Sequence, residues 1–211
     1  MPKVNEAERL MKLTEFERPL WAAGEAVCGM DEVGRGPLAG PVVTCCLIMP
    51  PEPLIEGVND SKKLSEKKRA LLYDRIAQTA CTIGFGVCDE KVIDEVNILN
   101  ATKRAFAEAY FNMGVPADTA LIDAVQGLEI PCRRHSIVHG DALSYLIACA
   151  SIMAKVTRDR MMEEFDSVYP GYGFAKNKGY GTAEHIAALK TLGPCPIHRR
   201  SFIGHFVKGE G

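Results

Sequence analysis

Short apolar runs, each about the length of a strand, are separated along this chain by turns rich in Gly, Pro and charged residues. Runs at 26–30 and 42–49, joined by a Gly- and Pro-rich link, predict two strands in a hairpin-like connection. Further apolar runs predict strands at 83–88 and at 119–123, and the segment 134–138 is interpreted as one more strand. The chain is therefore expected to build a five-stranded sheet.

Helical periodicity fills the segments between these runs. The first two dozen residues predict a helical lead-in that ends at 19–21, with one apolar face made of Leu10, Leu13, Phe16 and Leu20. Ser65 caps a second helix, whose core-facing side chains are expected to be Leu71, Leu72, Ile76 and Ala80. Further helices are predicted from about 98 to 113, from near Asp141 to about 165, and from Thr182 to Gly193.

The order of these elements predicts a mixed α/β sheet flanked by helices on both faces. A strand–helix–strand unit is expected from 83 to 123, made of the strand at 83–88, the helix after it and the strand at 119–123. Such a unit implies that the two strands are a parallel pair with a right-handed crossover. One catalytic domain preceded by a helical lead-in is expected. The helical lead-in covers 1–24, and the catalytic domain with a C-terminal helical extension covers 25–211.

Composition indicates a cytoplasmic protein with a real core. The chain has 211 residues, 47% of them apolar, and no apolar stretch approaches the roughly 20 residues that a membrane span needs. Its N-terminus is polar and has no signal-peptide core. The 8 cysteines form no C-x-x-C pair, which disfavours a disulfide or zinc framework. A formal net charge of -2 gives no sign of a nucleic-acid partner, although net charge hides local segregation.

Four carboxylates stand where strands end or a helix begins. Asp31 and Glu32 end the first strand, Asp123 ends the strand at 119–123, and Asp141 follows a glycine at the start of the long helix. Each has a structural reading when taken alone, because a solvated pair, a turn residue and a helix N-cap all use these residue types. Adjacent carboxylates repel one another, and a bound divalent cation is the common compensation.

Taken together, the four carboxylates predict an oxygen-only metal site at one edge of the sheet. Such a site suits Mg²⁺ or Mn²⁺ rather than zinc. Two such ions roughly 4 Å apart activate a water and stabilise a leaving oxygen, which favours hydrolysis of a phosphodiester.

The segment from Asp31 to Val42, Asp31-Glu32-Val33-Gly34-Arg35-Gly36-Pro37-Leu38-Ala39-Gly40-Pro41-Val42, resembles the signature of bacterial ribonuclease HII. Further motifs follow in the family's order: Asp60-Ser61-Lys62-Lys63-Leu64, Asn97-Ile98-Leu99, Gly140-Asp141-Ala142, Ala150-Ser151-Ile152-Met153-Ala154-Lys155-Val156-Thr157-Arg158-Asp159, Lys178-Gly179-Tyr180-Gly181-Thr182 and His198-Arg199-Arg200-Ser201-Phe202. The likeness covers about 28–202. It implies a ribonuclease H fold and a monomeric endonuclease that cleaves RNA in RNA–DNA hybrids and at single ribonucleotides in duplex DNA.

The resemblance also implies roles for individual residues. Asp31, Glu32, Asp123 and Asp141 match the metal-binding catalytic carboxylates of the family. The Gly34-Arg35-Gly36 turn matches the segment that reads the ribose 2′-hydroxyl, and Tyr180 matches the tyrosine at the RNA–DNA junction. Glycines let the backbone approach a sugar closely, and the 2′-hydroxyl is the group that distinguishes RNA from DNA. A packed loop aromatic is the alternative reading of Tyr180.

Three short segments depart from the usual family pattern: His139-Gly140-Asp141, Asn177-Lys178-Gly179-Tyr180 and Ala124-Val125-Gln126. The first replaces the common Lys-Gly-Asp and removes a fixed positive charge near the site. None of the three removes a catalytic carboxylate, so they bear on substrate affinity and leave the reaction in place.

Basic residues for a phosphate track fall in several clusters. Ser61 and Lys62, inside a family motif, are the preferred phosphate-binding candidates, while the run at 67–69 reads as a solvated helix face. The remaining clusters are Lys176 with Lys178, and His198 with Arg199 and Arg200. Lys155 suits a carboxylate as well as a phosphate.

Two other function classes stay open at this point. A catalytically silent binder of hybrid duplexes is disfavoured because four carboxylates facing phosphates would weaken its binding. A metal-dependent phosphatase for small molecules lacks a pocket motif and leaves the tyrosine loop unexplained. The related type III enzymes usually carry an extra N-terminal domain and lack the Gly-Arg-Gly sequence, so the type II enzyme fits better.

Overall fold

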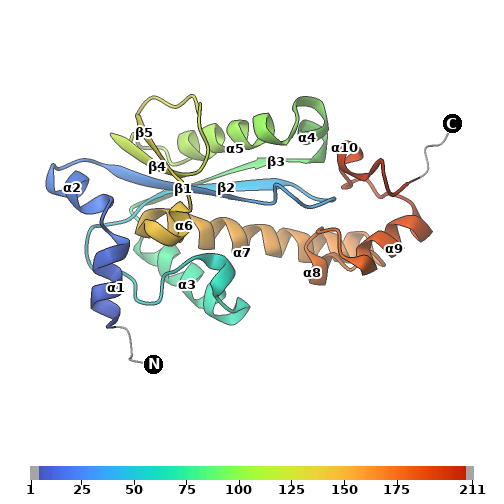
Figure 1. Ribbon diagram of the computed structural model, residues 1–211, viewed down its shortest axis with the longest axis horizontal. Coiled ribbons are helices and arrows are strands. Elements are labelled where there is room, and N and C mark those ends of the chain that lie inside the picture. The colour runs from blue at the N-terminus through green and yellow to red at the C-terminus, as the bar shows by residue number, and fades with distance from the viewer. Residues whose placement is uncertain (1–4, 208–211) are drawn as a thin grey trace.

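Five strands form one mixed sheet in the computed structural model, in the spatial order β3-β2-β1-β4-β5 (Figure 1). The structure describes residues 5–207. The strands are β1 Val27–Val33, β2 Val42–Ile48, β3 Thr82–Cys88, β4 Thr119–Asp123 and β5 Arg133–Ile137. β2 runs antiparallel to both β1 and β3, and β4 runs parallel to both β1 and β5. The predicted mixed five-stranded sheet is confirmed.

Helices cover both faces of this sheet, α5 on one side and α7 with α3 on the other (Figure 1). Their bounds are α1 Glu6–Leu13, α2 Glu17–Ala22, α3 Glu66–Thr79, α4 Glu90–Val96, α5 Ile98–Asn112, α6 Gly140–Leu143, α7 Tyr145–Val168, α8 Phe174–Asn177, α9 Ala183–Leu192 and α10 Arg200–Ile203, with a 3₁₀ turn at Ser61–Lys63. Helices α8 to α10 form the predicted C-terminal extension at one end of the molecule. Ser65 and Thr182 cap α3 and α9 as expected.

The expected parallel pair of β3 and β4 needs correction. The two strands run in the same direction, but the antiparallel hairpin of β1 and β2 lies between them in the sheet. The partner of β4 is β1, with Cys28 opposite Ala120 and Met30 opposite Ile122. The hairpin connection predicted between β1 and β2 is present.

The helix expected to begin near Asp141 is in fact two helices. Ser144 adopts an extended conformation, with φ -123° and ψ 130°, and its side chain accepts a hydrogen bond from the Ile147 amide. A serine in this conformation caps a new helix, so α7 begins at Tyr145 and α6 is a separate short helix. Asp141 lies inside α6 and is not the N-cap of either helix.

Close contact between β1 and α7 depends on Gly29. A Cβ atom at this position would lie 2.3 Å from the main-chain carbon of Leu146. The absence of a side chain therefore lets α7 lie directly against the strand. The larger apolar core fills the α7 side of the sheet, and a second core fills the α5 side. On α3, Leu72 and Ile76 are buried as expected, whereas Leu71 is exposed.

The N-terminal segment folds as two helices rather than one. Leu10 and Leu13 are buried as predicted, but Phe16 lies in the turn between α1 and α2 and is exposed to solvent. Residues 1–4 of the expected lead-in, and residues 208–211, lie outside the described part of the chain. Within the described part, no helix is both long enough and apolar enough to span a bilayer.

Candidate metal centre and nucleic-acid interface

Strand register brings Asp31 and Asp123 together at the end of the sheet. Met30 lies beside Ile122 in the parallel pair of β1 and β4, and the aspartate follows in each strand. Asp141 reaches the same place from α6. One carboxylate oxygen from each of these aspartates lies within 4.8 Å of the others. Three of the four predicted carboxylates thus form one cluster.

Glu32 lies next to this cluster but not in it. The negative charge of Glu32 raises the pKa of Asp31, and the negative charge of Asp123 raises the pKa of Glu32, so the Glu32 carboxylate lies close to the cluster. Its Oε1 lies 3.5 Å from the Arg35 guanidinium, while its Oε2 is buried and has no hydrogen-bond partner among the described residues. A buried carboxylate oxygen without a partner is costly and favours a cation nearby.

The electrostatics of the cluster favour proton or cation uptake. Burial raises the pKa of Asp31 well above its ordinary value, and the negative charges of Glu32 and Asp123 raise it further, while a hydrogen bond from Ser151 acts in the opposite direction. Burial also raises the pKa of Asp123. The Gly140 amide, which donates a hydrogen bond of 2.7 Å to Asp123 Oδ1, lowers this pKa in part. Burial raises the pKa of Glu32, partly offset by Arg35.

These residues fit a hard divalent cation. Their donor atoms are all carboxylate oxygens, the type that Mg²⁺ and Mn²⁺ prefer. The orphaned Glu32 oxygen and the raised pKa of Asp31 both indicate negative charge that the protein alone leaves uncompensated. The Lys62 ammonium, 3.1 Å from Asp141 Oδ2, offsets part of it.

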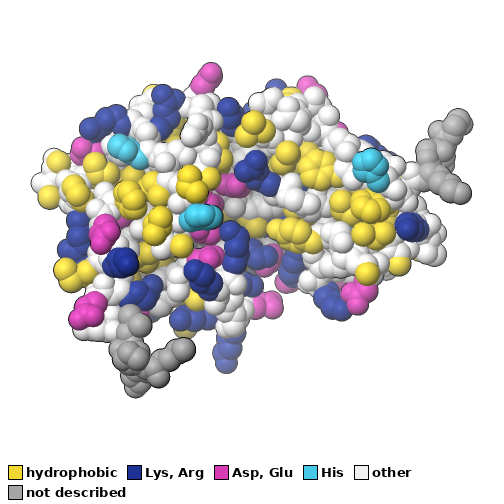
Figure 2. Space-filling view, in the orientation of Figure 1, with side chains coloured by type: hydrophobic (Ala, Val, Ile, Leu, Met, Phe, Trp, Pro, Cys, Tyr) yellow, Lys and Arg dark blue, Asp and Glu magenta, His cyan; other side chains and the backbone are white. Residues whose placement is uncertain are grey.

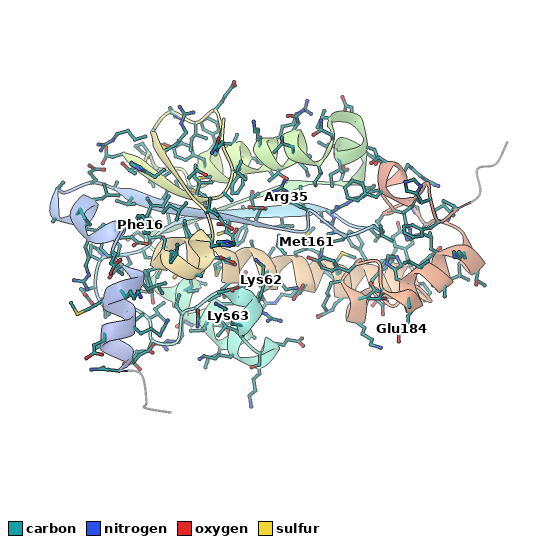
Figure 3. The ribbon with its side chains drawn as sticks, viewed as in Figure 1. Phe16, Arg35, Lys62, Lys63, Met161 and Glu184 are labelled. Carbon is teal, nitrogen blue, oxygen red and sulfur yellow. The ribbon has the colours of Figure 1, made fainter. Side chains whose placement is uncertain are left out.

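Ser61 and Lys62 have different surroundings. Ser61 is buried, and its hydroxyl lies 2.9 Å from the Ser151 hydroxyl on α7. The side chains of Lys62 and Lys63 are 77% and 63% exposed, so they are the groups of this turn that face solvent. Figure 3 shows both lysines beside the sheet end that carries Arg35, and Figure 2 shows basic side chains gathered around acidic ones there.

The Gly34-Arg35-Gly36 turn lies directly after β1 and faces Tyr180. A Cβ atom at Gly36 would lie 3.9 Å from the Tyr180 ring, so the ring borders the turn. Tyr180 is 43% exposed, which disfavours the reading of a packed loop aromatic. Gly34 has φ 94° in the left-handed region, where glycine is favoured. The structure therefore brings together the two segments expected to contact the sugars.

Parts of two predicted phosphate clusters need correction. His198 and Arg199 are buried, and burial together with the neighbouring His185 lowers the pKa of His198 to about 4. Arg200 alone of that cluster is exposed. Lys178 is only 15% exposed and pairs with Glu163 at 2.6 Å, whereas Lys176 pairs with Glu184 at 3.1 Å but is 79% exposed and stays a phosphate candidate. Lys155 binds Asp159 at 2.6 Å, so it contacts a carboxylate.

Some residues that shape the site had no assigned role in the sequence. Ser151 connects Asp31 to Ser61 across α7. Asn177 accepts from the Gly179 amide and donates to the Tyr172 carbonyl, which holds the loop before Tyr180. Both lie inside or beside motifs of the family, and that position is the only signal the sequence offers for them.

Glu17 connects the N-terminal helices to the start of α7. Its side chain is fully buried, and Oε1 accepts from the Ser144 hydroxyl at 2.5 Å and from the Leu146 amide at 3.0 Å. Its Oε2 has no partner among the described residues. The carboxylate thus accepts a hydrogen bond from an otherwise unpaired amide in the first turn of α7. This contact lies at the break between α6, which carries Asp141, and α7.

Replacing Glu17 by Gln should flatten the pH dependence of stability. Burial raises the pKa of Glu17, so its protonated form stabilises the folded protein below the ordinary glutamate pKa. This stabilisation is lost as the pH rises through the raised pKa. The glutamine keeps an acceptor for Ser144 without the charge. The melting temperature of Glu17→Gln relative to wild type should therefore rise between pH 4.5 and pH 8, measured by circular dichroism in EDTA. A constant difference across this range would contradict the expectation.

Comparison with known proteins agrees with this geometry. Residues 28–205 match the family model described as ribonuclease HII. The chain is 53% identical over 204 residues to ribonuclease HII of Ruminiclostridium cellulolyticum, covering 96% of this chain and 80% of the relative. The crystal structure of the ribonuclease H2 from Pyrococcus horikoshii OT3 is 25% identical, with a TM-score of 0.72, covering 87% of this chain and 99% of that chain. The ribonuclease HII in a PCNA complex from Archaeoglobus fulgidus is 26% identical, with a TM-score of 0.70, and the match covers 83% of this chain and 94% of that chain. The expected ribonuclease H-like fold is confirmed.

Proposed function

The chain belongs to the ribonuclease HII family, whose members cleave RNA in RNA–DNA hybrids, and from this premise we propose that it also nicks duplex DNA at single embedded ribonucleotides. The nick falls on the 5′ side of the ribonucleotide and leaves a 3′-hydroxyl and a 5′-phosphate. One observation carries the proposal. The Gly34-Arg35-Gly36 turn follows the cluster carboxylate Asp31 by three residues and has Tyr180 on its other side.

The carboxylates supply the reaction centre. Two divalent ions, Mg²⁺ or Mn²⁺, would be held by Asp31, Asp123 and Asp141, with the nearby Glu32 carboxylate as a further ligand. Divalent ions bound there supply the Lewis-acid chemistry of phosphodiester hydrolysis. Lys62, which pairs with Asp141 in the free protein, is exposed enough to contact a substrate phosphate.

The Gly34-Arg35-Gly36 turn and Tyr180 determine which phosphodiester bond is cleaved. Backbone groups of Gly34, Arg35 and Gly36 contact the 2′-hydroxyl, because glycine lets the chain approach the sugar. Tyr180 lies beside the following sugar and favours a deoxyribose there, since a ring in contact with that sugar leaves no room for an added hydroxyl. Together they select a ribonucleotide followed by DNA.

A labelled DNA duplex with one ribonucleotide tests the proposal directly. Incubation with the protein in Mg²⁺ or Mn²⁺ should give one product, cut 5′ of the ribonucleotide, and extension of that product by a DNA polymerase should confirm its 3′-hydroxyl. The same duplex without a ribonucleotide, and a reaction in EDTA, should stay intact. Products are resolved on a denaturing gel.

Two outcomes would overturn the proposal. A chain that binds this duplex without cutting it in either metal would be a silent binder. The chain could instead cleave a continuous RNA–DNA hybrid and leave the single-ribonucleotide duplex uncut. That result would restrict it to the activity shared by the family, and it would remove the role proposed for the turn and Tyr180.

A further inference from the structure

Two buried arginines lie behind the Gly34-Arg35-Gly36 turn. Arg158 comes from α7 and Arg199 from the residue before α10, and both side chains are fully buried. Neither forms an ion pair with a carboxylate of residues 5–207. Burial lowers the pKa of Arg158 to about 10 and that of Arg199 to about 9. A buried charge without a counter-ion is costly unless its donors are all satisfied.

Arg199 satisfies its donors with the carbonyl groups of the turn itself. Its Nη2 donates to the Gly34 carbonyl at 2.6 Å, and its Nη1 donates to the Arg35 carbonyl at 3.0 Å. Its Nε donates to the Gly40 carbonyl at 2.9 Å, where the link enters β2. The planar guanidinium thus holds both ends of the link between β1 and β2 in one geometry.

Arg158 joins the same link to the tyrosine loop. Its Nε donates to the Pro41 carbonyl at 2.9 Å, its Nη2 to the Ala39 carbonyl at 3.1 Å and its Nη1 to the Lys178 carbonyl at 2.8 Å. Lys178 lies two residues before Tyr180. A Cβ atom on Gly34 would lie 2.3 Å from Arg158 Nε, so the guanidinium packs directly against the turn.

These bonds determine which way the peptide groups of the turn point. In a trans peptide the N–H and the C=O point in opposite directions. With the carbonyls of Gly34 and Arg35 directed at Arg199, the next amides, those of Arg35 and Gly36, point away from the interior. Neither amide donates to a protein acceptor within residues 5–207. A charged donor on each carbonyl also polarises the peptide and strengthens its N–H as a donor.

We propose that Arg199 is a positioning residue that directs the amides of Arg35 and Gly36 at the ribose 2′-hydroxyl and so sets the preference for ribonucleotides. Arg158 keeps the tyrosine loop in register with the same turn. The inference rests on the proposed reading of the 2′-hydroxyl by this turn. It adds that the discrimination depends on a buried cation that never touches the substrate.

Arg199→Lys and Arg199→Met test this role. A lysine keeps the charge but cannot donate to both turn carbonyls from a planar fork, and a methionine keeps the apolar stem. Steady-state kinetics in Mg²⁺ give KM for the single-ribonucleotide duplex, and an all-DNA duplex as competitor gives Ki. In both variants KM should rise about tenfold, as expected for weakening one or two oriented hydrogen bonds, while Ki stays within twofold of wild type. Arg104→Met, an exposed arginine on α5, is the matched control and should change neither.

The outcomes separate this inference from the proposed function. If the wild-type KM for the single-ribonucleotide duplex equals the Ki of the all-DNA duplex, the protein does not recognise the ribose, and the proposed function fails. A wild-type preference that persists in both folded variants, or KM and Ki rising equally, would overturn the role of Arg199. Hydrogen exchange of the wild-type protein gives an independent check. The amides of Arg35 and Gly36 should exchange fast when free and slow on binding the ribonucleotide duplex. Slow exchange in the free protein would also overturn the inference.

Discussion

Asp31→Asn should lower the nicking rate about 1,000-fold, which corresponds to about 4 kcal/mol of transition-state stabilisation. Asp31 belongs to the carboxylate cluster and is only 4% exposed, so no solvent-exposed group can take its place. An amide is nearly the same size and shape, and it can still accept from the Glu32 amide, which donates to Asp31 Oδ1 at 2.8 Å. The loss should therefore come from the metal site and leave the fold intact.

The same substitution should raise stability in the absence of metal. Because the folded pKa of Asp31 is raised, protonation stabilises the metal-free protein, and that stabilisation is lost as the pH rises through the raised pKa. At pH 8 in EDTA, Asp31→Asn should melt above wild type. With Mn²⁺ the order should reverse, since only wild type gains from binding the ion. Activity within tenfold of wild type, or an unchanged order of melting, would remove Asp31 from the metal site. Asp74→Asn, an exposed carboxylate on α3, is the control.

Gly29→Ala should destabilise the protein by about 3 kcal/mol or more, because the new methyl has no space. Its carbon would lie 2.3 Å from the main-chain carbon of Leu146 and 2.5 Å from the Leu146 carbonyl oxygen. Main-chain atoms of a buried helix cannot move aside as a side-chain tip can, so α7 must shift from β1. For a chain of this length, that loss corresponds to a fall in melting temperature of roughly 6–12 °C.

The shift should also reduce activity, since Asp31 lies two residues along β1 from the point of contact. Gly204→Ala is the matched control, because a Cβ there meets no heavy atom within 4 Å and its φ is -53°. It should change stability by less than about 0.5 kcal/mol. Thermal melts followed by circular dichroism give both values. Equal melting temperatures for the two variants would contradict the close packing of α7 on β1.

Local patterns were sufficient to predict the strands and their carboxylates. Strands β1 and β4 are short apolar runs that end at a turn, and this pattern located Asp31 and Asp123 at neighbouring strand ends. The break at Ser144 was missed because the apolar pattern of α7 continues through the residues before it. Only the extended backbone at that serine shows where the helix begins.

The buried charges were beyond the reach of local patterns. Arginine and glutamate are usually exposed, so His198-Arg199-Arg200 was interpreted as a phosphate-binding cluster and Glu17 had no role. Their burial depends on partners distant in sequence, for example the bond from Arg199 to Gly34, which joins residues 165 positions apart. No window of local sequence contains both partners of such a contact.

That separation also orders events during synthesis. At about 5–20 residues per second, roughly 8 to 33 seconds pass between the emergence of Gly34 and of Arg199, 165 residues later. All carboxylates of the cluster are already made when residue 141 is joined. The nascent chain therefore carries the carboxylates proposed for catalysis well before it carries the guanidinium proposed to position the Gly34-Arg35-Gly36 turn. On this proposal, a chain released before residue 199 would carry the carboxylates of the metal site but lack the residue that aligns the turn for choosing between a ribose and a deoxyribose.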